Sequence, residues 1–472
     1  MLDATVVGSG PNGLAAAVLL AARGYRVHVV EAAERIGGGC RTAELTLPGF
    51  RHDICSAVHP LGAASPFFRS LPLEEHGLQW IEPPIPLAHP LDDGTAAVLG
   101  RSPEETADGL GTDGRAWLRL MEPLTARAEE VLDLALAPPL RAARSPMLGA
   151  RLGMVALRPA SQIIRRFETA RARALFAGLA AHSAAPLSTA ATAGVGAILA
   201  LGAGMVGWPV AHGGSQTIVD ALAALLRAHG GTIETGVSIT DVGSLPPSRA
   251  VLLGTTAPQA ARVAGDRVPS RVQRALRRMR PGPGVFKVDL ALDAPIPWEA
   301  APCRRAGTIH VGGSYEEIAE AERRTTEGHH PDRPFVLVSQ PSLFDNTRAP
   351  EGHHTAWAYC HVPLGSTRDM TERIVAQIER FAPGFSDHIE AIHTMGPAAL
   401  EAYNRSYPGG DITGGAVGLR QVLLRPRAAL DPYRIGPDLW LCSAATPPGA
   451  GVHGMCGYHA ARSAARHLAA TR

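Results

Sequence analysis

A glycine-rich segment and a distant acid are the residues best suited to chemistry. GSGPNG, from Gly8 to Gly13, follows an apolar strand-like run and begins a helix-like run. Its glycines permit a tight turn, close approach of the backbone to a diphosphate, and close helix–strand packing. Glu31 ends the next strand-like run, where a carboxylate accepts hydrogen bonds from ribose hydroxyls. The pattern predicts a dinucleotide site whose residues are Gly8, Gly10, Pro11, Asn12, Gly13, Glu31 and Ala32.

A cationic loop follows this acid, and a second glycine motif lies far from it. The loop AAERIGGGCRT combines positive charge with backbone freedom, which suits a diphosphate. Its candidate residues are Arg35, Gly38, Gly39 and Arg41. GAGMVG, at 202–207, fits the same glycine pattern, but Pro209 interrupts the helix that should follow. We therefore predict one dinucleotide site, no separate NAD(P) domain, and a packing or cavity role for 202–207.

Lys287 is the only lysine among 45 lysines and arginines, and it lies in the strand-like run 284–292. A lysine ammonium is a compact charge whose pKa falls readily on burial, which favours a functional role. In the alternative, Phe286 and Val288 mark the buried face of a strand, and Lys287 and Asp289 face solvent. The sequence alone leaves both interpretations open.

Two histidines are weaker catalytic candidates. His59 and His453 lie in segments with family-like motifs, and either is suited to acid–base catalysis or to orienting a substrate. A packing role is the alternative for each of them. Neither a Ser-His-Asp pattern nor a metal-ligand spacing stands out, so we predict no metal site.

Several segments together resemble the FAD-binding amine oxidase and phytoene desaturase superfamily. They are the GSGPNG segment with Glu31, HGGSQTIVDALAALLRAHGGTIETGVSI, and LWLCSAATPPGAGVHGMCGYHAA. GFRHDICSAVHPLGAASPFF and YPGGDITGG resemble the phytoene-dehydrogenase-like branch, which includes the pyridine nucleotide-disulphide oxidoreductase domain-containing proteins. The resemblance implies non-covalent FAD, with Val237 near the adenine. It places Ser443, Gly454 and Met455 at the flavin end.

The same resemblance suggests a task for Lys287. In amine oxidase relatives, a lysine on a substrate-domain strand precedes an aromatic residue and holds a water at flavin N5. Lys287 precedes Pro297 and Trp298 in a similar way. The resemblance thus implies that Lys287 acts in reoxidation of the reduced flavin.

The resemblance also implies an α/β fold with two interleaved domains. A Rossmann-type FAD-binding domain is expected from 1–60, 210–270 and 430–472. A substrate domain of antiparallel sheet plus helices, an α+β unit, is expected from 61–209 and 271–429. Its helical part covers about 101–180, a stretch rich in Ala, Leu, Arg and Glu.

The expected activity is dehydrogenation of a largely apolar small molecule by hydride transfer to flavin N5, with oxygen or a quinone as electron acceptor. Three alternatives share the fold: C–N oxidation of an amine, isomerisation without net redox change, and binding without catalysis. An aromatic pair facing the flavin would favour the amine, whereas only 5% of residues are aromatic. The intact glycine motif and Glu31 argue against a binder that has no flavin.

Composition limits partners and location. A net charge of +2 gives no long-range attraction to nucleic acid. The six cysteines contain no CxxC pair, and the N-terminus carries no secretory pattern, so we expect a cytoplasmic protein. The uncharged segment 188–210 is long enough to span a bilayer but is rich in Ala and Gly. We expect it to be a buried element lining a cavity, and peripheral membrane contact stays open.

Overall fold

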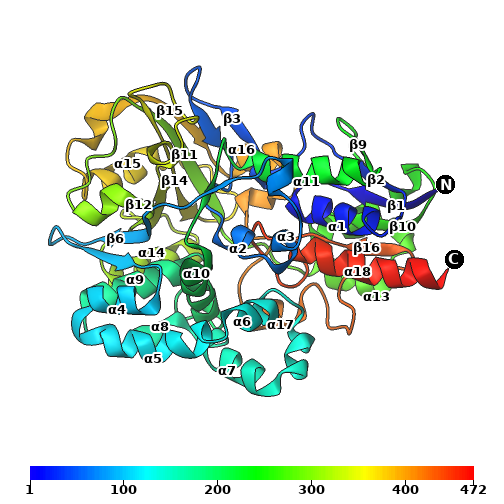
Figure 1. Cartoon of the computed structure of the whole chain (residues 1–472), viewed down its shortest axis with the longest axis horizontal. Helices are drawn as coiled ribbons and strands as arrows, with labels where there is room; N and C mark the ends of the chain where they lie inside the picture. The colour runs from blue at the N-terminus through cyan, green and yellow to red at the C-terminus, as the bar shows by residue number, and fades with distance from the viewer. Residues whose placement is uncertain (472) are drawn as a thin grey trace.

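A computed structural model describes residues 1–471 of the protein. One half of the molecule is built on a parallel five-stranded sheet (Figure 1). The strand order is β16-β10-β1-β2-β9, so the two ends of the chain lie in the same unit. Every pair in this sheet is parallel. The strands are β1 (Leu2–Val7), β2 (Val27–Val30), β9 (Thr232–Glu234), β10 (Ser248–Leu253) and β16 (Leu439–Leu441).

Three helices cover this sheet with small and aliphatic side chains. They are α1 (Pro11–Ala21), α11 (Gln216–Ala228) and α18 (Met455–Ala470). Pro11 occupies the first turn of α1, where its missing N–H costs nothing. α1 and α18 contact each other closely, because a Cβ added to Gly457 of α18 would overlap the carbonyl oxygen of Asn12. This packing fixes the N-terminus of α1 beside the end of β1.

The second half is built on a seven-stranded mixed sheet. Its order is β15-β11-β14-β13-β12-β6-β7, antiparallel except for the pair β12 and β6. One face forms an apolar core with α15 (Thr371–Glu379), through side chains such as Val288 and Val338. The strands are β6 (Ile85–Pro90), β7 (Ala96–Leu99), β11 (Gly284–Leu292), β12 (Ala306–Val311), β13 (Val336–Ser339), β14 (His354–Val362) and β15 (Ile389–Met395).

A group of helices lies below this sheet in Figure 1 and closes its other face. Six helices lie between 103 and 181, where the sequence predicts a helical stretch. The helices are α4 (Pro103–Gly109), α5 (Gly114–Thr125), α6 (Ala128–Ala135), α7 (Pro146–Ala156), α8 (Ala160–Ile164), α9 (Ala170–Ala181) and, after them, α10 (Thr192–Val206).

The Ala- and Gly-rich segment 188–210 contains the buried helix α10. The GAGMVG motif is the last turn of this helix and not a phosphate loop, as the sequence predicts. Most of α10 is buried against α9, and its Leu199 borders the central cavity. Across residues 1–471, the structure has no helix that is both long enough and apolar enough to cross a bilayer.

Shorter elements connect the two halves. Two small hairpins pair β3 (Thr42–Glu44) with β4 (Arg51–Asp53), and β5 (Trp80–Ile81) with β8 (Val210–Ala211). The remaining helices are α2 (Pro60–Ala63), α3 (Pro66–Arg69), α12 (Ala257–Val263), α13 (Ser270–Arg277), α14 (Tyr315–Thr326), α16 (Pro397–Tyr403) and α17 (Leu419–Leu424).

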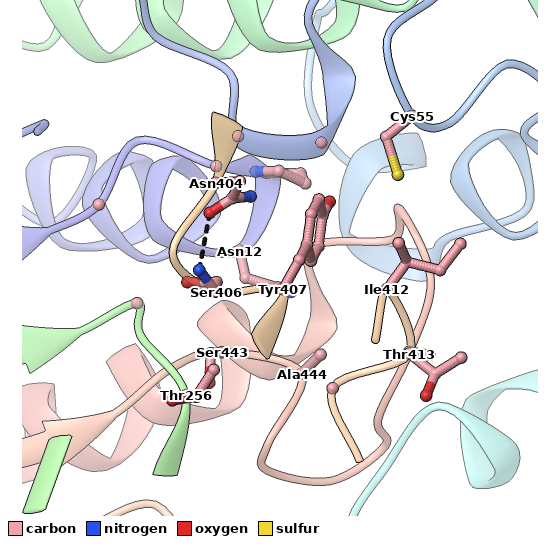
Figure 2. A pocket seen from close by; sticks show the side chains of 18 of the residues that line it. Asn12, Cys55, Thr256, Asn404, Ser406, Tyr407, Ile412, Thr413, Ser443 and Ala444 are labelled. Atoms are coloured by element: carbon pink, nitrogen blue, oxygen red, sulfur yellow. Dashed lines mark hydrogen bonds between the residues drawn. The ribbon is translucent and has the colours of Figure 1, made fainter. Parts of the chain in front are cut away.

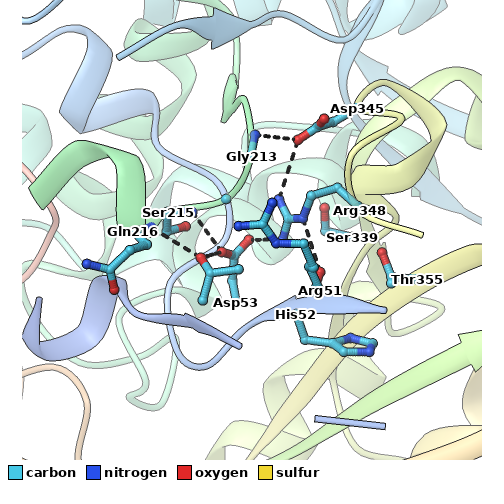
Figure 3. A network of polar contacts seen from close by, with 12 residues as sticks. Arg51, His52, Asp53, Gly213, Ser215, Gln216, Ser339, Asp345, Arg348 and Thr355 are labelled. Carbon is cyan, nitrogen blue, oxygen red and sulfur yellow. Dashed lines mark hydrogen bonds and ion pairs between the residues drawn. The ribbon is translucent and has the colours of Figure 1, made fainter. Parts of the chain in front are cut away.

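A buried ionic network joins the two halves (Figure 3). Arg348, only 1% exposed, donates to Asp53 Oδ2 at 2.6 Å and lies 4.0 Å from Asp345 Oδ2. Asp53 accepts hydrogen bonds from Thr42 Oγ1 and from the backbone N–H of Ser215. Since each buried carboxylate has a cation and donors, the charges are compensated, and the network holds the hairpin β3–β4 against the second half.

Candidate active site

One large cavity lies between the two halves, with a volume of about 730 Å³. Both sheets contribute to its wall, so it is continuous from the ends of β1 and β10 to the covered face of the seven-stranded sheet. Figure 2 shows the part of this wall that contains Asn12, Cys55, Tyr407 and Ser443. We call the part near β1 the dinucleotide end and the part near β12–β14 the sheet end.

The glycine loop at the dinucleotide end has the geometry that the sequence predicts. Gly8 has a φ of +99°, a conformation that favours glycine. A Cβ added to Gly13 would overlap the carbonyl oxygen of Gly8, so the third glycine is required for the turn itself. The cavity wall includes Gly8, Gly10, Pro11, Asn12, Gly13, Glu31 and Ala32.

Glu31 organises this loop from the end of β2. Its Oε2 accepts hydrogen bonds from the backbone N–H of Ser9 at 2.8 Å and from the Ser9 hydroxyl at 2.6 Å. Its Oε1 accepts the Ala33 N–H at 2.9 Å and lies 3.3 Å from Arg41 Nη2. The carboxylate therefore fixes the loop and still borders the cavity.

The cationic loop divides into an inner and an outer part. Arg41 is buried at the cavity wall, donates to the Arg35 carbonyl at 2.9 Å, and lies over the Tyr403 ring at 5.2 Å. Gly38 and Gly39 also line the cavity, and the Tyr403 hydroxyl donates to the Gly38 carbonyl at 2.6 Å. Arg35 itself is exposed and is not among the described lining residues.

Of the four residues expected near the adenine and the flavin end, two line the cavity and two do not. Val237, just after β9, and Ser443, just after β16, line the cavity. Gly454 and Met455 lie behind the described wall, because Gly454 packs against Phe68 and Ala15 and Met455 is in the core. The preceding loop borders the cavity instead, through Ala450, Gly451 and Val452.

The residues at this end fit an FAD dinucleotide. The backbone of the cationic loop passes close to the glycine loop, and glycine occupies the close approach on both sides. A Cβ added to Gly38 would lie 3.0 Å from Gly10 Cα. The N-terminus of α1 points N–H groups toward this space, which suits a diphosphate. The glycine loop, Glu31 and the loop after β16 would hold FAD, which would supply a hydride acceptor there.

His59 lies at the cavity wall, and one of its two ring nitrogens is hydrogen-bonded within the protein. The Ser215 hydroxyl donates to the Ser56 carbonyl at 2.6 Å, so it accepts from His59 Nε2–H at 2.8 Å. Nδ1 then carries a lone pair and has no hydrogen-bond partner within residues 1–471. Burial lowers the pKa of His59 to about 4, so the ring is neutral near pH 7.

His453 has both ring nitrogens engaged by its own loop. Its Nδ1 accepts the Met455 N–H at 3.0 Å, and its Nε2 donates to the Ala450 carbonyl at 3.3 Å. Burial lowers the pKa of His453 to about 4. The ring is not part of the described cavity wall, so the structure gives His453 a role in shaping the loop before α18.

Lys287 does not face solvent, which corrects that alternative for both Lys287 and Asp289. The two side chains are 2% and 0% exposed and form an ion pair with each other. Asp289 also lies 3.6 Å from His52 Nδ1 and 3.5 Å from His393 Nδ1. Lys287 shares a sheet face with Tyr359, a cavity residue directly opposite on β14, but is itself behind the described wall.

Several wall residues escape the sequence analysis. Figure 2 shows a loop near Asn404, Ser406 and Tyr407, where the Ser406 N–H donates to Asn404 Oδ1 at 3.0 Å. Cys55 and Thr256 also line this part. Thr256 lies in the GTTAP segment directly after β10, and this position could have indicated a wall residue, because residues at the carboxyl end of a parallel strand border the crevice. Residues 404–406 belong to no motif with a stated mechanism, whereas Tyr407 begins the YPGGDITGG segment that carries the family resemblance.

The sheet end of the cavity is mostly apolar and aromatic. Its side chains come from α10, from the loop before β8, and from three strands of the second sheet. They are Leu199, Trp208, Thr308, Leu337, Trp357 and Tyr359, together with His182 at the end of α9. The Trp357 and Tyr359 rings meet edge to face, with centroids 5.0 Å apart.

Metal and thiol chemistry have little support in the part of the chain that the structure describes. No group of three or more His, Cys, Asp or Glu side chains there is arranged to hold a metal ion. The six cysteines are free and buried. Burial raises the pKa of Cys456 to about 11 and of Cys442 above its ordinary range, which disfavours the nucleophilic thiolates.

The chain is similar to curated proteins along its length and in its first segment. A model of the NAD(P)-binding Rossmann-like domain matches residues 6–71. Pyridine nucleotide-disulfide oxidoreductase domain-containing protein 2 of Rattus norvegicus is 26% identical over 99% of this chain and 94% of its own length. A limonene dehydrogenase chain of Castellaniella defragrans is 32% identical, over 23% of this chain and 19% of its own length.

Solved structures share the whole fold. An oxidoreductase from Methanosarcina mazei has a TM-score of 0.65 at 16% identity, covering 98% of this chain and 100% of its own. A putrescine oxidase variant with redesigned cofactor binding has a TM-score of 0.63 at 19% identity, covering 99% of both chains. The expected resemblance and fold class are confirmed: the chain has a Rossmann-like dinucleotide-binding segment and shares its whole fold with these oxidoreductases.

Proposed function

We propose that the protein removes a hydride and a proton from neighbouring atoms of a largely apolar small molecule and so forms a C=C bond or a related unsaturation. The supporting observation is the continuity of the dinucleotide end with an apolar sheet end that contains Leu199, Trp208 and Leu337. The glycine loop and Glu31 at the dinucleotide end would hold FAD, which would supply the hydride acceptor, and oxygen or a quinone would take up the electrons. The chain contributes by orienting the substrate and excluding water.

An amine substrate is the second candidate, because the Trp357–Tyr359 pair is the kind of aromatic pair that C–N oxidation uses. The charges of the wall favour the apolar substrate. Among described lining residues, carboxylates come only from Glu31 and Asp411. Glu31 is engaged by Ser9 and Ala33, and Asp411 accepts the N–H groups of Gly282 and Thr413. The sheet end therefore offers no counter-ion for a protonated amine.

Anaerobic flavin bleaching distinguishes the two candidates. Purified holoenzyme is mixed with lipophilic polyenes or with primary and secondary amines, and the visible flavin absorbance is followed. We expect bleaching by a polyene class and none by the amines. Bleaching by amines alone would overturn the proposal in favour of C–N oxidation, and conversion of substrate without bleaching would indicate an isomerase.

Two residues are proposed to assist. The unpartnered Nδ1 of His59 is a neutral acceptor beside the cavity, which suits orienting a substrate or taking a proton from it. Lys287, on the cavity side of the second sheet, is proposed to act in flavin reoxidation. His453 is the weaker catalytic candidate, since both of its ring nitrogens already hold the loop.

Peripheral membrane contact is proposed through α7. Met147, Met154 and Leu157 at the end of this helix are exposed and spaced by seven and three residues, so they share one face, near Arg151. An apolar stripe beside a cation suits the interface of an anionic bilayer. Co-flotation with vesicles containing phosphatidylserine, reduced in Met147→Ser/Met154→Ser, is expected. Flotation unaffected by the substitutions would remove α7 from the proposal.

A further inference from the structure

Two rows of side chains cross the covered face of the seven-stranded sheet. Strand register places Thr308, Ser339 and Trp357 directly opposite one another on β12, β13 and β14. Two residues further along, the same strands align His310, Leu337 and Tyr359. Side chains in directly opposed positions share a sheet face. Since Thr308, Trp357, Leu337 and Tyr359 line the cavity, this face forms the floor of the sheet end.

Two polar groups in this floor have no partner. Thr308 is 3% and Trp357 8% exposed, and both line the cavity. Within residues 1–471, neither Thr308 Oγ1 nor Trp357 Nε1 has a hydrogen-bond partner. Ser339, between them, differs: its hydroxyl donates to the Gly307 carbonyl at 2.8 Å. Buried polar groups are nearly always paired in folded proteins, so an unpaired couple at a cavity wall indicates a ligand that pairs with them.

A neutral histidine pair adjoins the same floor. His182 Nε2 lies 2.9 Å from His310 Nε2, so one ring must donate to the other. His310 Nδ1 has no partner among the described residues, and Gly178 packs directly against it. An unpaired acceptor costs less than an unpaired N–H, which favours Nε2–H of His310 as the donor. His182 then carries its proton on Nδ1 as a donor, and its ring borders the cavity.

Both rings are uncharged at neutral pH. Burial lowers the pKa of His182 to about 3, and burial together with the neighbouring His182 and His89 lowers the pKa of His310 well below its ordinary value. The indole N–H of Trp357 can only donate. The group facing this floor must therefore offer a lone pair, which excludes an ammonium, and it finds no formal charge to balance a carboxylate.

We propose that the floor formed by Thr308, Trp357 and His182 binds an uncharged oxygen function, a hydroxyl or a carbonyl, at one end of an otherwise apolar substrate. The proposal deepens the proposed function and rests on its apolar substrate. The hydroxyl of Thr308 and the N–H groups of Trp357 and His182 supply the recognition. The apolar chain then lies against Leu199, Trp208 and Leu337.

Binding of four matched probes tests this class of ligand. Farnesene, farnesol, farnesal and farnesoic acid share one C15 skeleton and differ in the terminal group. Each is titrated anaerobically into holoenzyme, and the change in flavin absorbance or tryptophan fluorescence gives Kd. We expect farnesol or farnesal to bind about tenfold more tightly than farnesene, and farnesoate at pH 8 to bind more weakly than either. Equal affinity for hydrocarbon and alcohol, tighter farnesoate binding, or no binding by any probe would overturn the proposal.

Variants locate the preference at the floor. Thr308→Val removes the hydroxyl at similar volume, and we expect the alcohol to lose about threefold to tenfold in affinity while farnesene is unchanged. Trp357→Phe provides a second variant if the first does not fold. Ser339→Ala is the control, because its hydroxyl already has a protein partner, and its four affinities should match wild type. Uniform losses for all probes would show a merely structural role.

The outcomes separate this proposal from the proposed function. Tight, Thr308-dependent alcohol binding without bleaching by any polyene would overturn the dehydrogenase and leave the polar floor standing. Bleaching by polyene hydrocarbons, with no tighter binding of probes that carry a terminal oxygen, would support the dehydrogenase and overturn the polar floor.

Discussion

The two ends of the cavity are built by different means. The dinucleotide end takes its form from one short segment, Gly8–Gly13, with Glu31 fixing the loop by four contacts at 2.6–3.3 Å. The sheet end is assembled from α9, α10 and three strands between 306 and 362. At the first end the buried carboxylate of Glu31 is paired with Arg41 and with backbone N–H groups, whereas at the second Thr308 and Trp357 have no polar partner within residues 1–471.

This difference separates a general task from a specific one. A cradle for a dinucleotide needs backbone geometry that few residues other than glycine allow, so its sequence is constrained. A substrate surface needs only side chains projecting from a rigid sheet, so many sequences serve. The ionic network of Arg348, Asp53 and Asp345 joins the two halves of the molecule that carry these two ends (Figure 3).

The largest expected effect comes from breaking the cradle. Gly13→Val puts a side chain where even a Cβ overlaps the Gly8 carbonyl, and we expect flavin content to fall below about a tenth of wild type. The ratio of flavin to protein absorbance measures it. Gly153→Ala in α7, where a Cβ meets nothing within 4 Å, is the control. Full flavin content in the Gly13 variant would contradict the cradle.

The second effect concerns the connection between the two ends. Arg348→Met leaves Asp53 and Asp345 buried without their cation, and we expect a loss of about 3–5 kcal/mol in the free energy of unfolding. Urea denaturation of the holoenzyme measures it. Arg323→Met, which removes exposed pairs with Glu320 and Glu327, should change little because solvent screens them. Equal losses would show that the network does not join the halves.

A third prediction uses pH and the buried histidines at both ends. In the folded state, burial lowers the pKa of His59 and His453 from 6.5 to about 4, and that of His182 at the sheet end from 6.5 to about 3. Between these values the unfolded chain binds protons that the folded chain does not. Stability is therefore complete above pH 6.5 and falls as pH decreases toward 4, by roughly 1.4 kcal/mol per pH unit for each such histidine.

Denaturant unfolding at pH 7, 6 and 5 checks this slope. Replacing the exposed His229 by Gln should leave the slope as it is. A free energy of unfolding that stays constant from pH 7 to pH 5 would mean that these rings are accessible to solvent, which would alter the neutral surface assigned to the sheet end.

The smallest expected effect concerns Lys287, which lies behind the wall of the sheet end, and the rate at which oxygen reoxidises the flavin. If Lys287 acts on the flavin, Lys287→Met should slow reoxidation by oxygen at least about tenfold, measured by stopped-flow after photoreduction. The double variant Lys287→Met/Asp289→Asn removes the carboxylate left unpaired and should remain slow. Unchanged reoxidation in the single variant would remove Lys287 from the mechanism.

The strands and helices that carry the cradle follow from local sequence. β1, α1 and β2 lie where the sequence predicts a strand before Gly8–Gly13, a helix after it and a strand before Glu31, and β11 matches 284–292. Burial of Lys287 does not follow, since apolar alternation on one face predicts a solvated opposite face. The helices and the hairpin β3–β4 cover that second face, and no local pattern records such a covering.

By itself, the sequence determined the dinucleotide end, because a glycine turn, a helix N-terminus and an acid at the end of the next strand lie within one segment of the chain. Only the tertiary structure decided the sheet end. Thr308 and Trp357 are separated by 49 positions (357 minus 308) and meet through β13, which registers both strands. Such rows depend on strand pairing between distant segments, whose energy comes from packing of the complete sheet and not from any local propensity.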